Sequence, residues 1–227
     1  MTGQFFATYQ RARTLVVWLC ACALALCSLT MLSACSEQKP TPDPSSSSAS
    51  SSPSLSAVNG TWMAGASASD WGTYTLESET FGNFSVDLPV QPSEEVDEDG
   101  NLRLIVKGET LTGAQYMLLV EPLDDSEFAA LTPMSEQERE GQLQWYAVDF
   151  VGAETFVENM QSAPYEGNAG VRYRATNFNA EVWTILVIDG EQGWVYSVCA
   201  YSYGDEPTLE EAEAAQRFLD SFHRIMT

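Results

Sequence analysis

The residues with the most specific chemistry lie near the N-terminus, where Cys35 directly follows Leu32, Ser33 and Ala34. The small side chains of Ser33 and Ala34 fit the pocket of a signal peptidase. The Cys35 thiol is a nucleophile on which a diacylglyceryl group could be built before cleavage. This arrangement predicts cleavage between Ala34 and Cys35, with lipid attached to Cys35.

The residues upstream of this motif support the same interpretation. Arg11 and Arg13 form a basic region, and no charge interrupts the apolar run from Leu15 to Leu32. Together with the motif that ends at Cys35, they resemble the type II signal sequences of bacterial lipoproteins. The resemblance implies that residues 1–34 are removed and that the mature chain is anchored outside the cytoplasm. The alternatives are conventional secretion and an uncleaved signal anchor, because about 18–20 apolar residues can also span a bilayer.

Residues that could support catalysis are scarce. The one histidine, His223, is expected beside Arg224 in the last turn of the final helix, where the helix dipole would stabilise its charge. The segment Gly65–Ser69 lacks the closing glycine of a nucleophile elbow. Carboxylate pairs could serve a glycosidase, but among 32 acidic residues no pair stands out. We predict no catalytic residue, and a carboxylate-dependent hydrolase of cell-envelope material is the alternative.

Cation binding would need a defined set of oxygen ligands. The stretch 95–100 places Glu, Asp, Asp and Gly at positions 1, 3, 5 and 6 of a calcium loop, but position 12 is Val106 instead of Glu. A tight turn at Asp99–Asn101 is the preferred interpretation. Since zinc-type spacings and phosphate or dinucleotide loops are also lacking, we predict no metal and no cofactor. A general cation-binding role for the acidic surface is a third hypothesis.

The acidic charge restricts the partners. Removal of Arg11 and Arg13 leaves 8 basic and 32 acidic residues, a net charge of −24. Such a surface repels nucleic acid and anionic lipid headgroups, which excludes a nucleic-acid partner. We therefore expect membrane contact through the lipid on Cys35, with an envelope protein as the candidate partner.

The mature chain has to fold without disulfide bonds. Cys20, Cys22 and Cys27 fall in the removed segment, and Cys35 would be blocked by lipid. Cys199 is then the one free thiol, and its strand context predicts a buried, inert residue. The 193 residues from Cys35 onward are enough for a single core, since a domain of this size buries roughly 70 % of its unfolded-chain surface.

Three segments follow from these observations. Residues 1–34 are the signal peptide, residues 35–58 are the lipidated cysteine with a tether rich in serine and proline, and residues 59–227 are one globular domain. The tether has too few large apolar residues to bury, so it should not fold by itself.

Within the domain, apolar alternation and capping residues predict strands and helices. Trp62 and Trp71 should lie in a lead-in before the first strand. The strands are expected near 74–76, 81–88, 102–109, 116–121, 155–160, 170–176, 180–188 and 193–201. A central helix should begin at Thr132–Pro133 or at a Ser135/Glu138 capping box and end at Gly152.

Thr208 and Glu211 should cap a final helix. Its apolar face would consist of Leu209, Ala212, Ala215, Phe218, Leu219, Phe222 and Ile225.

Two tryptophans flank the last predicted hairpin, whose turn is Asp189–Gln192. Trp183 and Trp194 could pair across this hairpin. Packing in the core or between strands is the favoured role, and an aromatic binding face is the alternative.

The element order predicts an α+β fold, a mainly antiparallel sheet covered by helices. The segments Phe84–Pro89 (FSVDLP) and Arg217–Phe222 (RFLDSF), with the central helix between them, resemble the PsbP-like superfamily. The resemblance implies an α/β/α sandwich and, because members are chiefly non-enzymatic, a binding or assembly function. No functional residue of that superfamily matches this chain.

Overall fold

The computed structural model describes residues 58, 60–67, 70–107, 114–151, 157–176, 179–202 and 206–226. All of them belong to one unit of the chain, residues 53–227. The predicted signal peptide, Cys35 and nearly all of the tether lie outside the described residues. So do Asn59 and Gly152, where we expect the domain to begin and the central helix to end.

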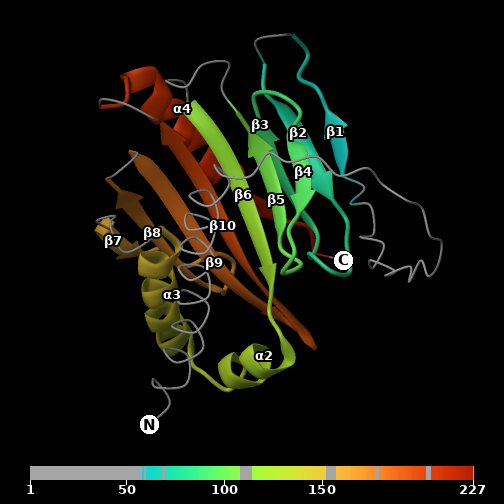
Figure 1. The fold of residues 1–227 in the computed structure, drawn as a ribbon, viewed down its shortest axis with the longest axis vertical. Helices are drawn as coiled ribbons and strands as arrows, with labels where there is room; N and C mark the ends of the chain where they lie inside the picture. The colour runs from blue at the N-terminus through green and yellow to red at the C-terminus, as the bar shows by residue number, and fades with distance from the viewer. Residues whose placement is uncertain are drawn as a thin grey trace, which may run out of the picture. The chain divides into compact units, whose positions relative to one another are not determined.

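A seven-stranded antiparallel sheet forms the centre of this unit, in the order β4-β5-β6-β10-β9-β8-β7 (Figure 1). The two longest strands, β9 and β10, form a hairpin whose turn includes Gly190 at a φ of 59°. This hairpin and the β5–β6 pairing confirm two predictions from the sequence. The strands are β4 (Ser93–Val96), β5 (Leu102–Val106), β6 (Ala114–Pro122), β7 (Val157–Ser162), β8 (Ala169–Ala175), β9 (Ala180–Asp189) and β10 (Gln192–Ser202).

A second, four-stranded sheet has the order β1-β2-β3-β11. It consists of β1 (Thr61–Met63), β2 (Gly72–Leu76), β3 (Phe84–Leu88) and β11 (His223–Arg224). In β2 and β3 every second residue is buried, so one face of this sheet is in the core. The prediction that Trp62 lies in a lead-in is wrong, because Trp62 pairs with Tyr74 as part of β1.

Three helices occur in the described part of the chain: α2 (Asp125–Leu131), α3 (Glu136–Val151) and α4 (Leu209–Asp220). The capping boxes of α3 and α4 confirm the predictions at Ser135 and Thr208, each of which pairs with a glutamate three residues later. The alternative start at Thr132 is wrong, since Thr132 is the C-cap of α2. Within the described ranges, no helix combines the length and the apolar character needed to cross a membrane.

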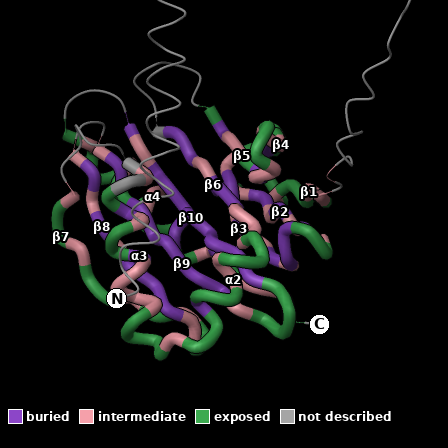
Figure 2. The backbone as a smooth tube through the Cα atoms, turned by 60° about the horizontal axis from the view of Figure 1, so that its bottom comes forward, coloured by how far each residue is buried: buried purple, intermediate pink, exposed green. Residues whose placement is uncertain are grey.

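Two apolar clusters lie on opposite faces of the large sheet, as the alternation along β8, β9 and β10 requires. One face packs against β2, β3 and α4, with Phe218, Leu219 and Phe222 in the contact. The other face packs against α3 through Leu143 and Ala147. Figure 2 shows the resulting buried segments along the central strands β6, β9 and β10. These contacts confirm the α+β class with a mainly antiparallel sheet.

The C-terminal segment corrects one prediction. The final helix ends at Asp220, and Ser221 is its C-cap, so Phe222 and Ile225 are not helical. His223 lies in β11 and pairs with Ser85, so its predicted place in the last helical turn is wrong. Leu209, which the periodic pattern assigned to the apolar face, is 77 % exposed.

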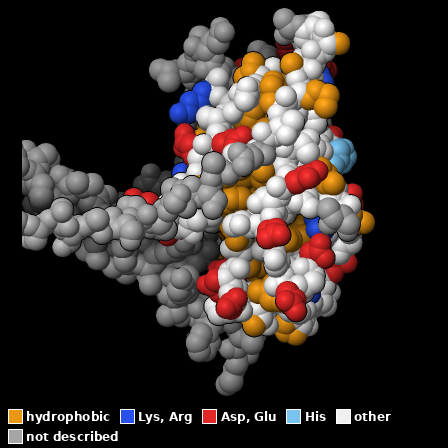
Figure 3. Space-filling model, turned by 90° about the vertical axis from the view of Figure 1, so that its right-hand side faces the viewer, with side chains coloured by type: hydrophobic (Ala, Val, Ile, Leu, Met, Phe, Trp, Pro, Cys, Tyr) orange, Lys and Arg blue, Asp and Glu red, His pale blue; other side chains and the backbone are white. Residues whose placement is uncertain are grey.

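The acidic composition extends to the surface. Figure 3 shows one side of the molecule, on which acidic side chains lie scattered among apolar ones and basic side chains are sparse. Several of the basic residues are engaged in ion pairs, among them Arg103 with Asp97 and Arg172 with Asp220. Excess negative charge therefore dominates the surface, in agreement with the composition.

Candidate functional site

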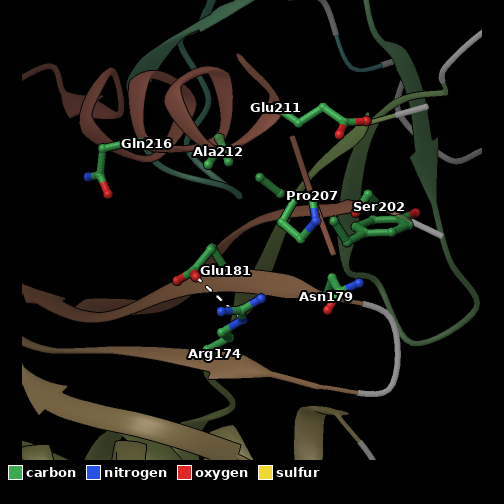
Figure 4. Close-up of a pocket in the computed structure, with 11 residues that line it drawn as sticks. Arg174, Asn179, Glu181, Ser202, Pro207, Glu211, Ala212 and Gln216 are labelled. Atoms are coloured by element: carbon green, nitrogen blue, oxygen red, sulfur yellow. Dashed lines mark ion pairs between the residues drawn. The ribbon is translucent and has the colours of Figure 1, made fainter. Parts of the chain in front are cut away.

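A cavity of about 240 Å³ lies between α4 and the adjoining ends of β8, β9 and β10 (Figure 4). The sheet contributes Arg174, Glu181, Ala200 and Ser202 to its lining. The helix contributes Ala212, Ala215 and Gln216 from the opposite side. The cavity is thus formed by residues that are far apart in the sequence.

Alanine residues on both sides explain why this space is open. On the face of β10 that packs against α4, the side chains become smaller from Tyr196 to Ala200. On α4, the half-buried Ala215 lies one turn before the buried Phe218. Elsewhere along this contact large side chains fill the space between helix and sheet. Where Ala200 and Ala215 meet, the side chains are too short to do so.

An opposite-charge pair lies on the sheet side of the cavity. Arg174 and Glu181 are direct partners in the β8–β9 register, and Arg174 Nε is 3.8 Å from Glu181 Oε1. That distance is an ion pair but too long for a hydrogen bond. Burial raises the pKa of Glu181, and the charges of Arg174 and Arg172 only oppose this effect. The Glu181 side chain is still 52 % exposed, so its carboxylate remains open to solvent and to a ligand.

Ser202 adds a hydroxyl group at the end of β10. Ser202 is 6 % exposed, and its Oγ has no hydrogen-bond partner in the described structure. A hydroxyl can donate one hydrogen bond and accept two, and leaving a buried one unpaired costs about 1–3 kcal/mol. Ser202 thus offers an unused polar group to the cavity.

The other polar side chains of the cavity have partners. Hydrogen bonds from the Thr208 backbone N–H and hydroxyl, 2.8 and 2.9 Å long, hold the Glu211 carboxylate and lower its pKa. Gln216 Nε2 donates to Asp220 Oδ2 at 2.8 Å. Arg174, Glu181 and Ser202 are therefore the groups best placed to bind a ligand.

Comparisons with known proteins give no guide to the function of this cavity. A scan against protein-family models and a search of curated proteins found no match. The interpretation of the site therefore rests on its own residues.

The two tryptophans predicted as a possible aromatic face lie inside the core. Trp183 and Trp194 are both buried, on the face of the large sheet that packs against β2, β3 and α4. Their indole N–H groups donate to backbone oxygens, Trp183 to Ala163 at 3.1 Å and Trp194 to Thr80 at 2.8 Å. This placement favours the packing role over the binding face. They do not pair with each other, because Trp183 faces Val198 and Trp194 faces Val187.

The acidic stretch considered as a calcium loop forms the turn between β4 and β5. The Asp97 carboxylate accepts hydrogen bonds from the backbone N–H groups of Asp99 and Asn101, and Gly100 adopts a φ of 86°. The predicted tight turn is confirmed. In the part of the chain that the structure describes, no group of three or more His, Cys, Asp or Glu residues is placed to hold a metal ion.

Cys199 is a free, buried cysteine in β10. Burial raises the pKa of its thiol to about 12. At pH 8 the fraction of Cys199 in the reactive thiolate form is then on the order of one in ten thousand, whereas roughly a quarter of an ordinary cysteine is thiolate. The predicted buried thiol is confirmed, and its chemistry is that of a small apolar residue.

We predict that native Cys199 reacts with iodoacetamide at least about a thousandfold more slowly than the same residue in the unfolded chain, because both the thiolate and access are lacking. Mass spectrometry of the peptide that contains Cys199 measures this rate at pH 8 with and without urea. Fast labelling of the native chain would show that β10 opens readily, in contradiction to this prediction.

Proposed function

We propose that this chain is the precursor of a lipid-anchored, non-catalytic binding or adaptor protein of the bacterial cell envelope. Residues 1–34 direct export, Cys35 carries the lipid, and residues 36–58 tether the domain outside the cytoplasmic membrane. The sequence Leu-Ser-Ala-Cys at 32–35, between an uncharged apolar run and the serine-rich segment, carries this proposal. A coil of this length spans about 25 Å, enough to hold the domain clear of the headgroups.

The cavity supports a binding role for the domain. It combines a small hollow with three polar groups, Arg174, Glu181 and Ser202, whose hydrogen-bonding capacity is not used up by their neighbours in the described structure. Binding sites typically have this form, a concave surface with a few convergent polar groups.

The hydrolase alternative receives less support from the same residues. It needs a pair of acids adapted to catalysis, both facing the substrate. The pKa of Glu181 is raised by burial, but Glu211 is committed to the cap of α4, and hydrogen bonds from Thr208 lower its pKa. Figure 4 places Glu211 on the far side of the cavity from Glu181. A non-catalytic role therefore fits these groups better.

We further propose that the domain is a divergent member of the PsbP-like superfamily. The feature in favour is the placement of α3 and α4 on opposite faces of the antiparallel sheet. The four-stranded sheet, which shares one of these faces with α4, is an addition to a simple three-layer arrangement.

Replacement of Cys35 by alanine should abolish lipidation, because no other residue of the motif can carry the diacylglyceryl group. Cells fed with radiolabelled palmitate should label the wild-type chain and not Cys35→Ala. The matched control is Cys27→Ala, which removes a thiol from the apolar run and should label like the wild type. Equal labelling of the Cys35→Ala chain would reject the anchor.

Cross-linking in intact cells then tests the adaptor role. Mass spectrometry should find an envelope protein enriched with the lipidated chain over the Cys35→Ala chain. Enrichment of no protein would direct the search to a small ligand in the cavity.

A further inference from the structure

The size of the cavity limits its ligand. At about 240 Å³ it is smaller than the roughly 300–1,000 Å³ of sites that hold drug-sized molecules. Ala200, Ala212 and Ala215 provide short apolar walls. Arg174 and Glu181 lie on the sheet side, and Glu211, on the helix side, is held in the cap of α4. A ligand that has only a few heavy atoms in addition to its polar groups would therefore fill this space.

The Arg174 guanidinium can accept an anionic group. It has five N–H donors in a planar fork, and in the described structure its charged partner is Glu181 at 3.8 Å, with no hydrogen bond between them. The fork therefore retains donors for a carboxylate, for which its geometry is suited.

The Glu181 carboxylate can accept a cationic group. Its side chain is 52 % exposed on the cavity side of β9, and Arg174 contacts it as an ion pair without a hydrogen bond, so the carboxylate is open to a ligand. An ammonium group beside Glu181 would add a charge-assisted hydrogen bond to this carboxylate.

Ser202 lies within reach of the same ligand. Glu181 faces Ala200 in the β9–β10 register, and Ser202 is two residues further along β10 on the same side. Diagonal neighbours of this kind are roughly 7–8 Å apart at their Cα atoms, a separation that a small molecule can bridge. The buried Ser202 hydroxyl would gain its missing partner in such a complex.

The geometry points to a small zwitterion as the ligand, a molecule that carries an ammonium and a carboxylate on the same carbon, as free α-amino acids do. Its carboxylate lies on Arg174, its ammonium on Glu181 and Ser202, and its side chain against the alanines of α4. A simple anion would meet the Glu181 charge and a simple cation the Arg174 charge, whereas a zwitterion complements both. This inference rests on the proposed binding function and gives it a ligand class.

The test uses the full chain purified in detergent. Each standard amino acid is added at about 10 mM, or at its solubility limit where that is lower, a concentration that reveals millimolar affinities, and the melting temperature is followed by differential scanning calorimetry. At least one amino acid should raise it, and calorimetry should give its affinity. The amide of that amino acid, which lacks the carboxylate, and its N-acetyl derivative, which lacks the ammonium, should each bind at least about tenfold more weakly.

Variants locate the binding in this cavity. Arg174→Gln and Glu181→Gln should each weaken binding about tenfold or more, because each removes one charged partner. Ala212→Leu, at an exposed helix position that tolerates leucine, should narrow the cavity and weaken binding without removing a charge. Arg103→Gln is the matched control. It removes the arginine of another ion pair, that of Arg103 in β5 with Asp97, and this variant should bind the amino acid as the wild type does.

Three outcomes would overturn the inference: no amino acid raises the melting temperature or gives heat, the amide or N-acetyl derivative binds equally well, or binding is unchanged in both Arg174→Gln and Glu181→Gln. The melting temperature of each variant without ligand reports its folding, and Ala212→Leu keeps the test decisive if a charge variant unfolds. Palmitate labelling and cross-linking test the anchor and the adaptor role separately. A lipidated chain that captures an envelope protein but binds no amino acid would reject this inference alone.

Discussion

Replacement of Phe222 by alanine is expected to lower the free energy of unfolding by about 3–5 kcal/mol. The side chain is completely buried, and its ring centroid lies 5.9 Å from Phe84, 5.9 Å from Tyr165 and 5.1 Å from Tyr196. The substitution removes these ring contacts and leaves a cavity between the two sheets. Urea unfolding of the full chain in detergent, followed by tryptophan fluorescence, measures the loss.

Leu209→Ala is the matched control for Phe222→Ala. Both residues belong to the single apolar face that helical periodicity predicts, but Leu209 is 77 % exposed. Its replacement should change the stability by no more than about 0.5 kcal/mol. Similar losses at the two positions would mean that Leu209 is packed in the core, contrary to its exposure in the structure.

Gly82→Ala is expected to cost about 2–5 kcal/mol, the second large effect. Gly82 has a φ of 72°, and a Cβ atom there would lie 2.2 Å from the hydroxyl of Tyr196. That hydroxyl donates a buried hydrogen bond of 3.0 Å to the Phe81 carbonyl, which would have to break or shift. The cost combines the strain of a left-handed alanine, about 1–2 kcal/mol, with the loss of a buried hydrogen bond, about 1–3 kcal/mol.

Gly167→Ala separates these two contributions. Gly167 has a similar φ of 78°, but no atom lies within 4 Å of a Cβ built on it. Alanine at position 167 should therefore cost the backbone strain alone, about 1–2 kcal/mol. Urea unfolding of both variants gives the comparison. If the two variants lose the same free energy of unfolding, the Tyr196 hydroxyl moves aside without a loss of stability, and the steric part of the prediction is wrong.

Features that depend on neighbouring residues could be predicted from the sequence alone. The capping boxes at Ser135 and Thr208 need only a glutamate three residues later. The turn at Gly190 needs only a residue that tolerates a positive φ. Alternation of apolar residues likewise predicted most of the strands, because successive side chains of a strand point to opposite faces. The Asp124/Glu127 capping box of α2 was an available signal that the prediction did not use.

The end of the last helix was decided by contacts between distant parts of the chain. Phe222 and Ile225 continue the apolar period of α4, so local patterning extended the helix to include them. In the folded chain Ser221 caps the helix and its hydroxyl accepts a hydrogen bond from the Asp87 backbone N–H. His223 then pairs with Ser85. These partners are more than 130 residues away, and no local pattern contains them.

The same reason explains why the cavity was not predicted. Strand periodicity alone places Arg174 between apolar residues of β8 and Glu181 near the start of β9. Inward-facing charges in apolar strands were the signal that could have singled them out. The docking of α4 on the sheet brings the helix alanines to the opposite side of the cavity from these two residues and Ser202. A hollow depends on which side chains from separate elements meet, and packing between elements sets that, not the periodicity of any one of them.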